Sequence, residues 1–218
     1  MAHATQAAEG ADFPDQSLGI AALAHAYDGD LQAATAMNDR FAVLTVSPTL
    51  LGFHSYVAGE IDALAGRTDR AQVHYLRAST LSRESGATFL DAIASVGHLT
   101  ALARDGRVAD ALDGYRALIE YWARTGGWVQ QWTTLRNLAE LLRTVDDQET
   151  AVYLEAAADN APDAPPSTGG GDDSDAADLP PDRLATILAA AAAASRDDIV
   201  AVALGALEHH RGSWLSGS

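Results

Sequence analysis

The chain has 218 residues, of which 30 are acidic and 14 basic, so its formal net charge is −16. This length accommodates one large domain or two small ones with a buried core, and a hydrophobic content of 48% is too high for a disordered chain. All 14 basic residues are arginine, and there is no cysteine. These absences exclude a phosphate-binding loop ending in Gly-Lys-Ser/Thr, a Schiff-base lysine, a disulfide and a cysteine-ligated metal.

The charge also limits the partners that we expect. Nucleic acids and anionic membranes are bound by clustered basic side chains, and here the arginines are scattered through an acidic chain. No stretch approaches 18 consecutive apolar residues, and the N-terminus lacks the basic-then-apolar pattern of a signal peptide. We therefore expect a cytoplasmic protein that binds neither nucleic acid nor membrane directly.

The chain is expected to begin with a disordered leader over residues 1–14, followed by a helical repeat domain over residues 15–160. Its 46 alanines favour closely packed helices, because alanine has the highest helix propensity and lets helix axes approach closely. We expect helices over 16–27, 30–45, 50–65, 68–84, 88–104, 108–124, 128–143 and 147–159.

An internal repeat is the strongest signal in this region. Turn segments centre on Gly29, Gly66, Gly106 and Asp146. Five residues after each turn stands an alanine, spaced 37, 40 and 40 residues apart: Ala34, Ala71, Ala111 and Ala151. Four residues further on, the two central copies carry Tyr75 and Tyr115. This period predicts an all-α solenoid of tetratricopeptide-like helix hairpins, with alanine at the helix crossings and the tyrosines filling the space between hairpins.

The repetition stops near Asn160. Residues 161–181 are rich in proline, glycine and aspartate and contain no basic residue, which indicates a flexible acidic linker. A C-terminal helix pair is expected over 182–210, docked on the last hairpin as a cap. The apolar face expected for its second helix consists of Ile199, Val202, Ala203 and Ala206.

The sequence shows no spacing of histidine, serine or carboxylate residues that is typical of a catalytic site. The seven histidines lack metal-ligand spacing, and His209 and His210, being adjacent, point about 100° apart on a helix. Ser55 lies outside a Gly-x-Ser-x-Gly elbow. Paired carboxylates such as Asp146 and Asp147 fall in a turn, where water keeps their pKa values ordinary. We expect a protein that is not an enzyme and has no metal or cofactor.

One segment contains more tryptophan and polar side chains than the helical repeat requires. Three of the four tryptophans lie between residues 122 and 132, beside glutamine, arginine and asparagine side chains. The first helix of a solenoid hairpin lines the concave face, so this segment predicts an aromatic, hydrogen-bonding recognition patch. Its candidate residues are Trp128, Gln131, Trp132, Arg136 and Asn137. The alternative is that the tryptophans pack between hairpins while the polar residues only solvate a face.

The same segment carries a family resemblance. The string Gln130-Gln131-Trp132-Thr133-Thr134-Leu135-Arg136-Asn137 and the C-terminal run from Ser195 to Leu204 resemble the tetratricopeptide-like C-terminal region of large bacterial regulators, signal-transduction ATPases that include LuxR-type and antibiotic-regulatory-type transcription factors. The resemblance covers roughly residues 50–208. It implies a sensor and interaction arm, since the ATPase and DNA-binding parts of such regulators match no residue of this chain.

Two functions follow as expectations. The first is a non-catalytic interaction module of a bacterial transcriptional regulator or signalling ATPase, which binds a protein, a peptide or a small-molecule effector on its concave face. The second is a structural arm that self-associates into a homo-oligomer through the apolar hairpin ends, without a ligand.

Overall fold

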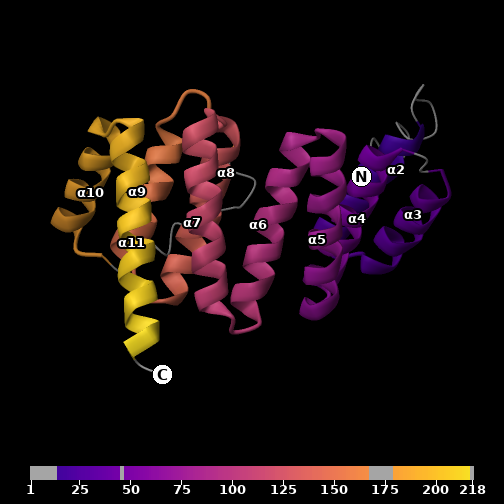
Figure 1. The fold of residues 1–218 in the computed structure, drawn as a ribbon, viewed down its shortest axis with the longest axis horizontal. Coiled ribbons are helices and arrows are strands. Elements are labelled where there is room, and N and C mark those ends of the chain that lie inside the picture. Colours follow the sequence, from indigo (N-terminus) through magenta and orange to yellow (C-terminus); the bar gives the residue numbers. More distant parts are fainter. Residues whose placement is uncertain (1–13, 45–46, 167–178, 217–218) are drawn as a thin grey trace. The chain divides into compact units, whose positions relative to one another are not determined.

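The computed structural model describes residues 14–44, 47–166 and 179–216, and side chains from residue 16 to residue 212 within these ranges. It contains ten helices in these ranges and no strand (Figure 1). They are α2 (Pro14–Tyr27), α3 (Leu31–Leu44), α4 (Pro48–Leu64), α5 (Thr68–Ser85), α6 (Thr88–Arg104), α7 (Val108–Thr125), α8 (Trp128–Thr144), α9 (Gln148–Asp159), α10 (Pro181–Ala193) and α11 (Arg196–Ser216). The predicted all-α, helical-repeat fold class is confirmed.

The chain divides into two compact units. Unit 1 extends to Gly106 and contains α2 to α6, and unit 2 begins at Arg107 and contains α7 to α11. The expected repeat domain over 15–160 therefore contributes hairpins to both units. The expected leader over 1–14 lies outside the described residues except for Pro14, the first residue of α2.

The four predicted turns are confirmed, each with a positive φ angle at its central residue. Gly66 and Gly106 have positive φ angles of 72° and 80°, a left-handed conformation that glycine adopts without steric cost. In the last copy of the turn, Asp146 takes the same conformation with φ of 63°, which a short polar side chain tolerates better than other non-glycine residues. The turn therefore keeps its geometry although the glycine is replaced.

The repeat alanines are buried, as alanine at a helix crossing requires. All four repeat alanines are fully buried: Ala34, Ala71, Ala111 and Ala151. Tyr75 packs between Gly59 of α4 and Gly97 of α6, so closely that a Cβ atom on either glycine would lie 2.7 Å from the tyrosine ring. Glycine at these two positions therefore makes the space that the aromatic side chain fills between successive hairpins.

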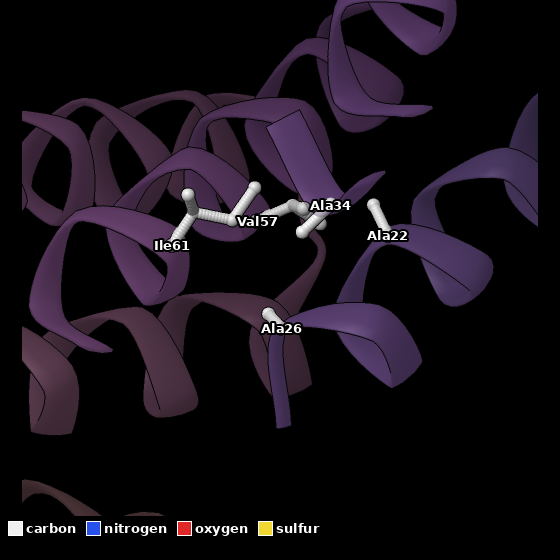
Figure 2. Close-up of a cluster of buried hydrophobic side chains, with 5 residues drawn as sticks. All are labelled: Ala22, Ala26, Ala34, Val57 and Ile61. Carbon is white, nitrogen blue, oxygen red and sulfur yellow. The ribbon is translucent and has the colours of Figure 1, made fainter. Parts of the chain in front are cut away.

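The apolar core of unit 1 begins at its first three helices. Ala22 and Ala26 of α2, Ala34 of α3, and Val57 and Ile61 of α4 form one buried cluster (Figure 2). Small side chains on α2 and α3 meet larger ones on α4, which lets the helices pack at short distance without leaving a void.

Unit 1 also holds two carboxylates among its hairpins. The Glu60 carboxylate accepts hydrogen bonds of 2.7 Å from the hydroxyls of Tyr27 and Tyr75. Burial and the Glu60 charge raise the pKa of Tyr27, Tyr56 and Tyr75 above the usual tyrosine value. Two residues along α4, the buried Asp62 accepts a 2.7 Å bond from Arg67, so both acids have donors supplied by their own unit.

In unit 2 the C-terminal helices pack on the repeat, but not with the expected face. Helix α10 contacts α9, and α11 contacts both α9 and α7. The buried stripe of α11 consists of Ile199, Ala203 and Leu207, whereas Val202 is 37% exposed. The expectation that Val202 faces the core was wrong, because α11 is rotated toward the i, i+4, i+8 row.

Three polar side-chain contacts accompany this packing, each joining a C-terminal helix to an earlier helix or its N-cap. Arg183 of α10 binds Glu149 of α9, His210 of α11 lies 2.9 Å from Asp147, and Arg211 lies 2.7 Å from Asp113 of α7. None of the described helices combines the length and the apolar composition needed to cross a membrane.

Candidate binding site

The candidate residues are positioned by the turn between α7 and α8. Gly126 ends α7 in the left-handed conformation with φ of 75°. The next residue, Gly127, is also required sterically, because a Cβ atom there would lie 2.6 Å from the Trp122 ring. The tight turn places Trp128 in the first turn of α8 and Trp132 one turn later, with ring centroids 5.3 Å apart.

Trp132 lies at the centre of the site. Its side chain is only 2% exposed, and its indole Nε1–H donates to Oδ1 of Asp163 at 3.0 Å. A buried indole N–H needs such an acceptor, since leaving it unpaired would forfeit its hydration without compensation. The acceptor comes from the segment after the last repeat helix, 31 residues further along the chain.

One turn beyond Trp132, Arg136 contacts the same segment. Its Nη1 donates to the carbonyl oxygen of Pro165 at 2.6 Å, and its Nη2 donates to Asp159 at 2.9 Å. The guanidinium group is thus used as a planar fork with one acceptor on each side. Trp128, Trp132 and Arg136 follow at intervals of four residues and therefore share one face of α8.

The first residue of α11 closes the site. Arg196 binds Oδ2 of Asp163 at 2.7 Å, and its guanidinium carbon lies 4.6 Å from the ring centroid of Trp128. Burial acts to raise the pKa of Asp163, but hydrogen bonds from Trp132 and Arg196 and the Arg196 charge outweigh it and hold that pKa below its usual value. Asp163 is therefore a charged acceptor between two donors.

The structure does not bring all five candidates together. Asn137 lies five residues after Trp132, about 140° around the helix, and its amide donates to the carbonyl of Thr133 within α8. Gln131 is fully buried, and neither polar atom of its amide has a partner among the described residues. Trp128, Trp132 and Arg136 form one site, which we call the α8 site together with Arg196, and the ligand-binding role of all five candidates stays a prediction.

Sequence reasoning missed Asp163, Pro165 and Arg196. Residues 161–181 were expected to be a flexible linker, yet residues 161–166 lie against α8, while 167–178 are outside the described residues. The available signal was the run Pro162-Asp163-Ala164-Pro165-Pro166 directly after the last repeat helix, because closely spaced prolines restrict the backbone and favour an ordered conformation.

The α8 site presents hydrogen-bond donors beside aromatic rings. It offers an indole donor, two guanidinium groups and an aromatic face, which suit carboxylates and carbonyl oxygens. Among the described residues, no group of three side chains could hold a metal ion.

Comparisons with family models, curated proteins and solved structures gave no match to this chain. The resemblance to bacterial regulators therefore rests on the sequence strings alone.

Proposed function

We propose that this chain is a non-catalytic helical-repeat interaction module that binds a protein or small-molecule effector at the α8 site. The effector contacts Trp128 through aromatic stacking, the Trp132 indole N–H through a hydrogen bond and Arg136 through charge-assisted hydrogen bonds. Buried aromatic and arginine side chains are the residue types that contribute most to binding energy at protein interfaces.

The observation that carries the proposal is that this face of α8 already binds a non-helical segment. Trp132 and Arg136 both donate hydrogen bonds to residues 163 and 165, outside any helix. A helix face that binds an irregular segment through side-chain donors has the chemistry needed to bind a similar segment from another molecule.

The test is a screen of peptides and small molecules against the purified full chain, followed by affinity measurement for every hit. Hits bound at the α8 site lose at least about tenfold in affinity in Trp128→Ala, the loss of a contact worth about 1.4 kcal/mol. Glu140→Ala, an exposed change on the same helix, is the matched control and leaves affinity unchanged. A set of hits that are all insensitive to Trp128→Ala contradicts the proposal.

We further propose that the module acts in the cytoplasm as the effector-sensing arm of a transcriptional regulator or signalling ATPase, on the basis of the Gln130–Asn137 and Ser195–Leu204 strings. Joined to the ATPase domain of such a regulator, the module makes the hydrolysis rate respond to the effector. A rate that is the same with and without a bound effector contradicts this part and leaves the binding function standing.

Self-association is the second candidate function, and one observation in unit 1 favours it. Val73 and Leu76, three residues apart on α5, are both more than half exposed, and Phe89 on α6 is exposed as well. Exposed apolar side chains at helical spacing are typical of contact surfaces. Sedimentation across a concentration series distinguishes the candidates, because a strict monomer at high concentration excludes self-association.

A further inference from the structure

We propose that the α8 site recognises a specific class of ligand, an acidic turn of the type Pro-Asp-x-Pro, and that residues 161–166 of the chain are its resident occupant. A partner carrying the same turn binds by displacing this segment. The inference rests on the proposed function, since it names the partner of the same site.

The conformation of the occupant defines the first part of the ligand. The amide of Ala164 donates to the carbonyl of Ala161 at 3.2 Å, which closes a four-residue turn. Pro162 stands at the second position of this turn, where its fixed φ angle is favourable. A peptide with proline at this position loses little conformational entropy when it binds.

The Asp163 carboxylate defines the second part. One of its oxygens accepts from the Trp132 indole and the other binds the Arg196 guanidinium. Two donors from different helices hold the two oxygens separately, so a glutamine or asparagine amide cannot satisfy both donors. The site therefore selects a carboxylate.

The Pro165 carbonyl defines the third part. It accepts a 2.6 Å bond from Arg136, and a proline there offers an acceptor without an amide N–H to satisfy in return. Arg136 and Arg196 place two positive charges at this position in a chain whose formal net charge is −16, and this local contrast favours an acidic ligand over a basic one.

The occupant is held in a way that permits displacement. None of residues 161–166 is buried, and the Arg196–Asp163 pair is exposed by 46% on the arginine and 36% on the aspartate. Exposed ion pairs contribute little to stability and weaken with salt. The hydrogen bonds from Trp132 and Arg136 also hold the segment, and its covalent attachment next to the site gives it a high effective concentration.

The experiment uses a fluorescein-labelled peptide with the sequence of residues 159–166 and measures its binding to the full chain by fluorescence anisotropy. The receiving variant is Asp163→Ala, which releases the resident turn without altering Trp132, Arg136 or Arg196. We expect the peptide to bind this variant at least about tenfold more tightly than the wild-type chain, because a short tether keeps its competitor at about millimolar effective concentration.

Two changes test the chemistry of recognition, and a third serves as their control. A peptide with the Asp163→Asn change binds the receiving variant at least about tenfold more weakly, as does the original peptide when Arg196→Ala is added to that variant. Arg183→Ala, which removes an exposed arginine paired with Glu149, leaves peptide affinity unchanged. Circular dichroism verifies that the helices persist, and Asp163→Asn, which keeps the side-chain volume, serves as the receiver if Asp163→Ala unfolds.

Equal binding of the peptide to wild type and to the receiving variants overturns the inference, and so does equal binding of the aspartate and asparagine peptides. Either result makes residues 161–166 a fixed part of the fold. An effector that needs Trp128 but does not compete with the peptide overturns the inference while the proposed function stands. Peptide binding as described, with no effector sensitive to Trp128→Ala, supports the inference and counts against the proposed function.

Discussion

Carboxylates connect repeat helices in both units, as Glu60 does in unit 1 and Asp159 does in unit 2, but in unit 2 carboxylates also attach the segments that follow the repeat. In unit 1, Glu60 and Asp62 accept hydrogen bonds from residues of neighbouring repeat helices or of the turn between them. In unit 2, Asp147 and Asp163 bind groups from the helices after the repeat, His210 and Arg196. The first arrangement connects repeat elements to one another, and the second attaches additional segments to a repeat.

The difference has a physical consequence for stability. A buried carboxylate such as Asp62 cannot lose its donors without desolvated oxygens being left behind. A carboxylate at an exposed attachment point regains water when its partner leaves, so the net cost is small. Changes in the polar groups of unit 1 should therefore affect folding, whereas changes at the attachment points of unit 2 should mainly affect which segments are bound.

The largest expected effect concerns Trp132, which belongs both to the hairpin core of unit 2 and to the attachment site. Trp132→Ala should lower the free energy of unfolding by about 3–5 kcal/mol, the usual cost of removing a large buried aromatic side chain. Urea unfolding followed by fluorescence reports on unit 2 selectively, because all four tryptophans lie after Arg107. Trp128→Ala, at a half-buried position, is the control and should cost clearly less; an equal cost would mean that Trp132 is not a core residue.

The next effect tests the packing of unit 1. Gly97→Ala should destabilise by about 1–3 kcal/mol, because the new Cβ atom would overlap the Tyr75 ring and overpack the contact. Unfolding is followed by circular dichroism, since unit 1 contains no tryptophan.

The matched control for this change is Gly205→Ala, another helical glycine but with nothing within 4 Å of the added Cβ. It should stabilise the chain by roughly 0.5–1 kcal/mol through helix propensity. The cost of Gly97→Ala should also shrink when Tyr75 is first replaced by leucine. If Gly97→Ala stabilises the chain instead, the Tyr75 ring can move away from the added Cβ atom at little cost.

A direct comparison of the two units comes from a pair of matched amide substitutions. Glu60→Gln should cost about 1–2 kcal/mol, because the amide replaces one of the two acceptor oxygens that receive tyrosine hydroxyls. Asp163→Asn should cost less than about 1 kcal/mol, as expected for an exposed pair. Chemical denaturation of both variants gives the ranking, and the reverse order would refute the distinction between the two kinds of carboxylate.

The smallest effect is a pH dependence at the attachment of α11. Burial acts to raise the pKa of Asp147, but hydrogen bonds from His210 and Thr150 outweigh it, so the folded-state pKa lies below its usual value. The stabilisation by Asp147 is therefore complete above the unfolded pKa of about 4 and is lost as the pH falls through the lower folded value. Relative to Asp147→Asn, the wild-type chain should lose roughly 0.2–1 kcal/mol between pH 5 and pH 2, the scale of a partly exposed ion pair. If the free energy of unfolding changes with pH by the same amount in the wild-type chain and in Asp147→Asn, this assignment is contradicted.

More of the fold than of the candidate site could be predicted from the sequence. The spacing of Ala71 and Ala111 and the position of Tyr75 predicted both the helix crossings and the aromatic packing, because each repeats at a constant distance from a turn. Within α8, helical periodicity correctly placed Trp132 and Arg136 together. It could not show that Gln131 is enclosed by the core, since burial of a polar side chain depends on the neighbouring helices.

What the sequence determined by itself is the set of local relations: where helices begin and end, which small residues meet at crossings, and which side chains share a face. These follow from backbone conformation and from a helical period that acts over a few residues. Only the tertiary structure decided that Trp132 and Arg196 meet at Asp163 and that Val202 faces outward. Such contacts join residues more than thirty positions apart or depend on the rotation of a whole helix, and no short-range pattern specifies either one.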